Sequence, residues 1–161
     1  MDKQQQIVDF LQFLDARIGQ EIHIGPWLKI DQQRINQFAD VTGDQQWIHI
    51  DPERAAKESP YGTTVAHGYL TLSLLPYLTE SNHPDFFTKN YPGMKYRVNY
   101  GLNRLRFPAP VKVGAKIRAR TTIQSAEEVK NGVQICYIIT VEIEGEIKPA
   151  CSVEFLARLY P

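Results

Sequence analysis

The pattern of apolar and polar residues changes its period along the chain, from the spacing of helices to the spacing of strands. Apolar residues three and four positions apart predict an amphipathic helix within residues 1–19 and another helix at about residues 32–42. Residues 65–79 are apolar around most of a helical circumference, which predicts a buried central helix. Over residues 94–160 apolar and polar residues alternate, so this region should hold the main strands.

Breaks in these patterns predict how the elements connect. The alternation changes parity after Gly101, which indicates a β-bulge near Leu102–Arg104, and Asn131-Gly132 is typical of a tight hairpin. Residues 81–93 read as an irregular loop whose aromatic side chains could cover a pocket. Strands late in the chain and one apolar helix before them predict an α+β fold, with an antiparallel sheet wrapped around the buried central helix.

Composition limits the range of functions. A chain of 161 residues with 43% apolar and 22% charged residues is expected to form one domain, residues 1–161. The 18 basic and 18 acidic side chains balance, so nothing points to nucleic acid as a partner, and no apolar run is long enough for a membrane span. The first residues lack a signal-peptide pattern, and Cys136 and Cys151 form no disulfide framework. We therefore expect a cytoplasmic protein with reduced thiols.

The candidate chemistry lies in residues 31–62. Asp31 is placed to cap one helix and Gly43 to end it, while Asp51-Pro52-Glu53 is typical of the start of the next. Asp44 and His49 fall in the short connection between these helix ends. An aspartate after a glycine is most often only a turn residue, and an isolated histidine is most often structural. Held close together, however, the two side chains could act as a general acid and a general base.

Several motifs in this region and after it resemble one known family. Gly43-Asp44, Ile48-His49 and Asp51-Pro52, followed by the run Gly62-Thr63-Thr64-Val65-Ala66-His67-Gly68, resemble the hydratase motif of the MaoC-like (R)-specific enoyl-CoA hydratases. The segment 99–111 is similar to the NodN-like branch of that family. Most hydratases of the wider family carry Asn-Pro where this chain has Gln46-Trp47, and the NodN-like branch shares Gln-Trp. The resemblance covers roughly residues 20 to 160.

The resemblance implies a hot-dog fold and the (R)-specific hydration of trans-2-enoyl-CoA, or the reverse dehydration. Such a reaction needs a base, an acid and a group that holds negative charge on the thioester oxygen. We expect Asp44 and His49 to share a water and to supply the first two. The amide of Gly68, at the start of the central helix, is the candidate for the third. The alternative for Gly68 is tight packing of the helix start against the sheet.

Further residues are candidates for contact with the substrate. Polar or aromatic side chains near the motif, and near the expected bulge, make up this set: Gln46, Trp47, His67, Asn103 and Arg104. For His67 a structural role is the favoured interpretation. No cofactor is expected, because water is the co-substrate and coenzyme A is part of the substrate. No metal site is expected, because the four histidines are scattered without ligand spacing.

Two other functions compete with the hydratase. A hot-dog acyl-CoA thioesterase tends to carry an acidic residue on the central helix, and residues 65–78 contain none. A non-catalytic acyl-thioester-binding module would not need both Asp44 and His49. The resemblance also implies side-by-side pairing of two chains, so a homodimer is expected, because a lone sheet would leave an edge strand and an apolar face uncovered.

Overall fold

An antiparallel sheet of six strands forms one layer of the computed structural model, which describes residues 2–161. The order of the strands is β1-β4-β5-β6-β3, and the short β2 also pairs with β4. Their bounds are Glu21–Ile24 for β1, Leu28–Lys29 for β2, Tyr96–Arg106 for β3, Lys116–Val129 for β4, Gly132–Ile143 for β5 and Cys151–Tyr160 for β6. The α+β class and the antiparallel sheet predicted from the sequence are confirmed.

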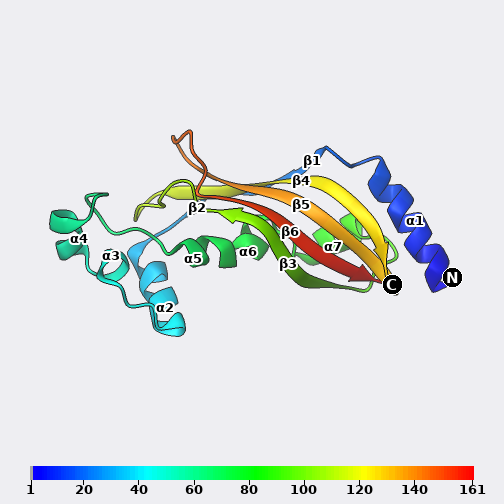
Figure 1. The fold of residues 1–161 in the computed structure, drawn as a ribbon, viewed down its shortest axis with the longest axis horizontal. Helices are drawn as coiled ribbons and strands as arrows, with labels where there is room; N and C mark the ends of the chain where they lie inside the picture. The colour runs from blue at the N-terminus through cyan, green and yellow to red at the C-terminus, as the bar shows by residue number, and fades with distance from the viewer. Residues whose placement is uncertain (1) are drawn as a thin grey trace.

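Three groups of helices surround the sheet (Figure 1). The helices α5 (Gly68–Ser73), α6 (Leu75–Leu78) and α7 (Pro84–Asn90) lie beneath it, along its concave side. The helix α1 (Lys3–Asp15) lies at one end. The helices α2 (Gln32–Thr42), α3 (Trp47–Ile50) and α4 (Pro52–Glu58) project beyond the other end. We name residues 31–62 the projecting segment.

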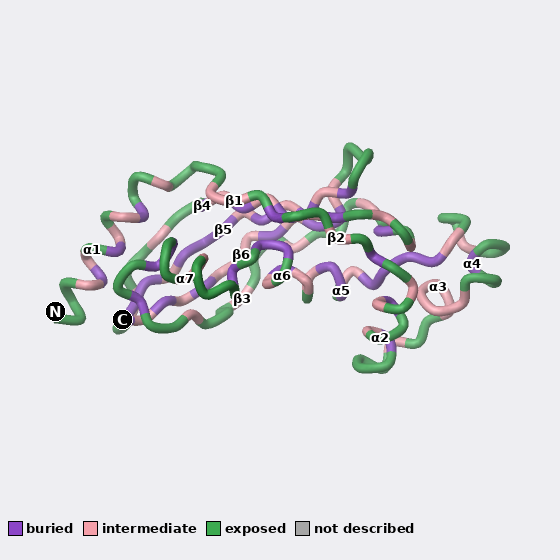
Figure 2. Tube along the Cα trace, turned by 180° about the vertical axis from the view of Figure 1, so that it is seen from behind, coloured by how far each residue is buried: buried purple, intermediate pink, exposed green. Residues whose placement is uncertain are grey.

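The core lies between the sheet and the helices below it. Alternate residues of the central strand β5 are fully or almost fully buried, as the period of two predicts. The apolar face of α1, formed by Ile7, Phe10 and Leu14, packs into the same core. Figure 2 shows the contrast with the projecting segment, most of which is exposed or half-buried. Among the described residues, no helix is both long and apolar enough to cross a membrane.

The central helix differs from the single helix expected over residues 65–79. It begins only at Gly68 and is divided at Leu74 into α5 and α6. Pro76 accounts for the division, because it has no N–H to donate to the carbonyl four residues earlier. Its surroundings also differ, since Tyr69 and Tyr77 are 67% and 57% exposed. The expectation of burial around most of the circumference was therefore wrong for the single chain, which leaves one face of this helix open.

Two other expectations concern the connections. The irregular loop expected at residues 81–93 contains the helix α7, which Pro84 and Asp85 start in its first turn. The predicted bulge is confirmed, because the pairing of β3 with β6 shifts between Asn103 and Arg106, and Arg104 has a φ of 44°. The predicted hairpin is confirmed as well, with Asn131 at a φ of 62° between β4 and β5.

Candidate active site

The helix ends of the projecting segment are held by the caps that the sequence predicts. The carboxylate of Asp31 accepts a hydrogen bond from the amide of Arg34 at 2.9 Å, and Asp51 does the same for Arg54 at 3.0 Å. Gly43 ends α2 with a φ of 76°. Asp44 follows directly, and His49 lies on the single turn α3. The two candidate residues are therefore fixed by helix ends on both sides.

Val65 connects this segment to the body of the protein. Its N–H donates to the carbonyl of Ile48 at 3.2 Å, and its carbonyl accepts from Nδ1 of His49 at 2.7 Å. Val65 also forms an isolated bridge with Lys112, next to the sheet. The imidazole of His49 is thus held by a main-chain group three residues before the start of α5.

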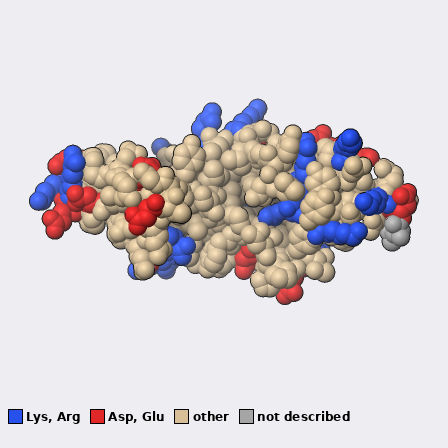
Figure 3. All heavy atoms as spheres, turned by 90° about the horizontal axis from the view of Figure 1, so that it is seen from below, with Lys and Arg blue, Asp and Glu red and all other residues tan. Residues whose placement is uncertain are grey.

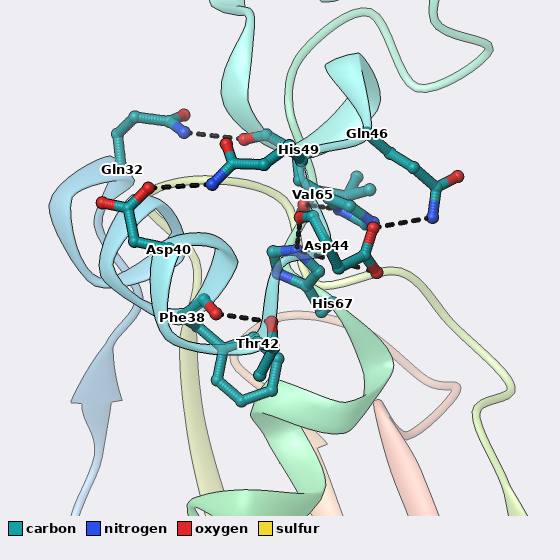
Figure 4. Close-up of polar contacts among 10 residues, drawn as sticks. Gln32, Phe38, Asp40, Thr42, Asp44, Gln46, His49, Val65 and His67 are labelled. Atoms are coloured by element: carbon teal, nitrogen blue, oxygen red, sulfur yellow. Dashed lines mark hydrogen bonds and ion pairs between the residues drawn. The ribbon is translucent and has the colours of Figure 1, made fainter.

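His67 lies against His49 (Figure 4). The two rings are stacked with centroids 3.8 Å apart, and the ring of Phe38 lies 5.0 Å from His67 on another side. Nε2 of His67 donates to the main-chain carbonyl of Asp44 at 3.0 Å and lies 4.0 Å from its carboxylate. The side chain is 3% exposed. His67 therefore connects Asp44 to His49 through one hydrogen bond and one ring contact.

The carboxylate of Asp44 is oriented by its neighbour in the loop. Nε2 of Gln46 donates to Oδ1 of Asp44 at 2.9 Å (Figure 4). This hydrogen bond lowers the pKa of Asp44 below its ordinary value, because it stabilises the charged form, and the nearby histidines act in the same direction. Asp44 is therefore a carboxylate at neutral pH.

The imidazole of His49 is uncharged at neutral pH. Burial lowers its pKa from the ordinary value of 6.5, because it disfavours the imidazolium, while the hydrogen bond to Val65 and the charge of Asp44 oppose this shift. A carbonyl oxygen only accepts, so Nδ1 of His49 carries the proton and Nε2 is left with a lone pair. The site therefore presents one carboxylate and one neutral imidazole, both able to accept a proton.

The expectation that the histidines are scattered was wrong for two of them. A carboxylate oxygen of Asp44 and one ring nitrogen each of His49 and His67 all lie within 4.8 Å of one another. These are the residues that could hold a divalent cation. Two ring nitrogens are already engaged, with the carbonyls of Val65 and Asp44. This leaves Nε2 of His49 and Nδ1 of His67 with the lone pairs that a cation would need.

Gly68 follows His67 as the first residue of α5. Within the described residues its N–H has no hydrogen-bond acceptor, since the bonds of this turn start from Leu70 and Thr71. A Cβ added at Gly68 would lie 3.0 Å from the ring of Phe107. The glycine therefore allows close packing of the helix start against Phe107, and it leaves a free amide next to His67.

The other predicted contact residues divide into two groups. Gln46 and His67 belong to the cluster. Trp47 begins α3 beside it, but its ring packs on the guanidinium of Arg54 at 4.4 Å. Asn103 and Arg104 lie apart, on the bulge of β3, where Asn103 lines a hollow with Glu154 and Arg104 lies 3.8 Å from the same carboxylate. The structure does not bring these two into the cluster.

Sequence reasoning missed one residue that holds the site together. Gln32, in the first turn of α2, donates through Nε2 to the carbonyl of His49 at 2.7 Å. Its Oε1 accepts from the hydroxyl of Thr64 at 2.5 Å. One side chain thereby ties α2, α3 and the strand-like residues 64–66 together. A glutamine on a helix carries no sequence signal for such a role, because its partners are 17 and 32 residues away.

Comparison with known proteins identifies the family that this sequence matches. The profile of the family described as "MaoC like domain" matches residues 13–146. The 3-hydroxyacyl-thioester dehydratase Z of Mycobacterium tuberculosis is 49% identical over 146 residues, which are 90% of this chain and 92% of that protein. Nodulation protein N of Rhizobium meliloti is 40% identical over 145 residues, 89% of this chain and 87% of the relative. Both the family and the NodN-like branch expected from the sequence are confirmed.

A solved structure agrees at the level of the fold. The (R)-hydratase from A. caviae superimposes with a TM-score of 0.66 at 21% identity, over 89% of this chain and all of that one. At this identity the likeness shows the fold alone, and it confirms the hot-dog architecture expected from the sequence. The name of the mycobacterial relative, a 3-hydroxyacyl-thioester dehydratase, agrees with the expected enzyme class, a hydro-lyase.

Proposed function

Because the chain belongs to the MaoC-like domain family, we propose that it adds water across the double bond of a trans-2-enoyl-CoA to give the (R)-3-hydroxyacyl-CoA, and catalyses the reverse dehydration. One observation carries the proposal: a carboxylate oxygen of Asp44 and a ring nitrogen of His49 lie within 4.8 Å of each other. Two hydrogen bonds of about 2.8 Å can join such atoms through a single water.

In this proposal the two groups have different roles. Nε2 of His49 accepts a proton from the water as the water oxygen attacks the β-carbon of the substrate. Asp44, with its lowered pKa, is the weaker base, so it holds the water by a second hydrogen bond and stabilises the imidazolium that forms. His49 then gives the same proton to the α-carbon. The product gains one hydroxyl and one hydrogen, which together are the water consumed.

The attack places negative charge on the thioester oxygen, and Gly68 supplies a donor for it. Its N–H lacks an acceptor among the described residues, and it follows directly after His67, which is bonded to Asp44. A donor already in place costs no reorganisation during the reaction, and loss of one such donor typically slows a reaction by about two to three orders of magnitude.

The remaining contact residues act around this centre. Gln46 and His67 hold Asp44 and His49 in position, and Trp47 borders the same loop. Asn103 and Arg104 are proposed to contact the coenzyme A portion, because a guanidinium binds phosphate well. The side chain of Arg104 is 84% exposed, and among the described residues its one ion pair is long, at 3.8 Å, so it is free to do so. The reaction needs no metal and no cofactor beyond water.

We propose that the chain acts as a homodimer. The eleven-residue strand β3 is the last strand of the sheet, and its outer edge has no partner among the described residues. Beside it, Tyr69 and Tyr77 of the central helices and Tyr100 of β3 are more than half exposed. Light scattering at micromolar concentration should give twice the mass of the chain, and the mass of a single chain would contradict the dimer.

One assay separates this function from its alternatives. Purified protein is mixed with crotonyl-CoA, and the loss of enoyl absorbance is followed together with the release of free thiol. Hydration removes the absorbance without releasing thiol. Release of thiol would indicate a thioesterase, and binding without either change would indicate a non-catalytic module, so either result would overturn the proposal.

A further inference from the structure

A cavity lies under the sheet, and neither Asp44 nor His49 lines it. It has a volume of about 470 Å³, within the range of small-molecule sites. It begins at Leu72, one helical turn after Gly68, and passes between the central helices and the strands β3 and β5. Most of its wall is apolar, formed by Ile22, Leu72, Leu75, Pro76, Phe86, Leu102, Ile139 and Phe155. A chain of methylene groups would fit such a wall.

The far end of this cavity is cationic. Arg97 of β3 lines it, and it also lines a neighbouring hollow of about 380 Å³ with Ser81, Asn82, Phe87 and Asn99. The guanidinium therefore lies at the boundary between an apolar cavity and a more polar one. Figure 3 shows the underside of the molecule, where the middle of the face carries few charged side chains and those towards the N-terminal end are mainly basic.

Arg97 differs from Arg118 and Arg120 of strand β4 in its partners. Arg118 and Arg120 bind the carboxylate of Glu142 at 2.7 and 2.6 Å. Arg97 contacts only neutral oxygens: Ser81 Oγ at 3.0 Å, Asn82 Oδ1 at 3.3 Å and the hydroxyl of Tyr91 at 3.5 Å. Within residues 2–161 no carboxylate lies within 4.0 Å of it. A half-buried guanidinium with neutral neighbours only is a strong site for an anion.

We propose that this cavity binds an aliphatic chain that ends in a carboxylate, with the chain along the apolar wall and the carboxylate on Arg97. Two molecules share this chemistry. One is a free fatty acid. The other is the acyl chain of a thioester with a second carboxylate at its distal end, whose thioester would lie towards Gly68. This second case rests on the proposed function, and the first does not.

Direct binding tests the site without any need for turnover. Calorimetry on the full chain compares decanoate with 1-decanol, which has the same chain length and no charge. Wild type should bind decanoate more tightly. Arg97→Gln should weaken decanoate binding about tenfold or more, as for the loss of a charge-assisted hydrogen bond, and leave decanol unchanged. Arg97→Lys, which keeps the charge, should recover part of the affinity for decanoate.

Lys95→Gln is the matched control, because it removes a positive charge two residues away on an exposed side chain that does not line the cavity. It should leave both affinities unchanged. Equal binding of acid and alcohol by wild type would overturn the proposal. So would a loss in Arg97→Gln that affects decanol equally, or a loss of decanoate binding in Lys95→Gln as large as in Arg97→Gln. Melting temperatures of all variants show whether a loss reflects unfolding.

Kinetics separate the two ligands that share this chemistry. Enoyl-CoA substrates of equal length, ending in a methyl or in a carboxylate, are compared in wild type and Arg97→Gln. A higher kcat/KM for the carboxylate-ended substrate, lost in Arg97→Gln, identifies the ligand as the distal end of the substrate. Competitive inhibition by decanoate, without that preference, identifies it as a free acid. Failure of hydration itself with decanoate binding intact would contradict the proposed function and not this site.

Discussion

The projecting segment and the sheet are built from contacts of very different range. The caps of α2 and α4 join residues three positions apart, and Gly43 closes α2 on the residue four before it. The sheet pairs β1 with β4 and β3 with β6, whose paired residues lie far apart in the sequence. Short-range contacts form the helix ends on either side of the chemical groups, and long-range contacts form the cavity below the sheet.

This difference in range separates the residues that carry out the reaction from the residues that bind the ligand. Asp44 and His49 lie in a short stretch between two helix ends, and the contacts of His49 with Val65 and of Asp44 with His67 then fix this stretch against the body of the protein. The cavity depends on the packing of at least three strands and two helices, and its charged end lies on β3, far along the chain from Asp44. Changes in the projecting segment should therefore affect the reaction, and changes in the sheet should affect what binds.

The largest effect should follow from Asp44→Asn. The amide keeps the size of the side chain but loses the negative charge that holds water and stabilises the imidazolium, so kcat should fall by about two to four orders of magnitude. The melting temperature should change little, because Asp44 is half-exposed. Asp40→Asn is the control, since this exposed carboxylate on α2 accepts from the side chain of Gln45 and lies outside the cluster. If both variants lose the same activity, the cluster is not the active site.

An intermediate effect should follow from Gln32→Leu. The variant loses hydrogen bonds to the carbonyl of His49 and to the hydroxyl of Thr64, at about 1 kcal/mol each in unfolding free energy. We expect a lower free energy of unfolding in denaturant titration and a fall of several-fold in kcat, because α3 is less firmly held. Gln33→Leu, at the exposed neighbouring position, should leave both the free energy of unfolding and kcat unchanged. Equal losses in both would show that Gln32 holds nothing beyond its own helix.

The smallest effect concerns pH. Because the pKa of His49 lies below 6.5 and Nε2 must be unprotonated, kcat/KM of wild type should fall on the acid side with a midpoint below 6.5. The unfolded state binds this proton more readily, so stability should also decrease as pH falls below 6.5. In Asp44→Asn the residual activity should have its midpoint at still lower pH, since the charge of Asp44 raises the pKa of His49. A midpoint that moves upward would contradict this electrostatic link.

Much of the projecting segment follows from the sequence, and the reason is its short range. Asp31, Gly43 and Asp51 each act on residues within four positions, so cap and turn rules suffice to place Asp44 and His49 between two helix ends. The bulge of β3 and the hairpin at Asn131 were predicted on the same basis. These features depend on the backbone preferences of a few residues that are adjacent in the sequence.

The remainder needed the folded chain. Three features join residues that are distant in the sequence, by 17 positions or more. They are the stacking of His67 on His49, the bridge made by Gln32, and the place of Arg97 at the end of an apolar cavity. The break in the central helix shows a second limit, because hydrophobic periodicity gave the apolar stretch but neither its start at Gly68 nor the open face at Tyr69. No local pattern carries that information.

The central claim is that Asp44 and His49 act on one water, and a double-mutant cycle tests it most directly. Rates of hydration of crotonyl-CoA are measured for wild type, Asp44→Asn, His49→Gln and the double variant, with melting temperatures to verify the fold. Each single variant should lose about two to four orders of magnitude, and the double variant should be barely slower than either, because residues that act as a unit are not additive. Two losses that multiply in the double variant, or single variants near wild-type rates, would contradict the shared water.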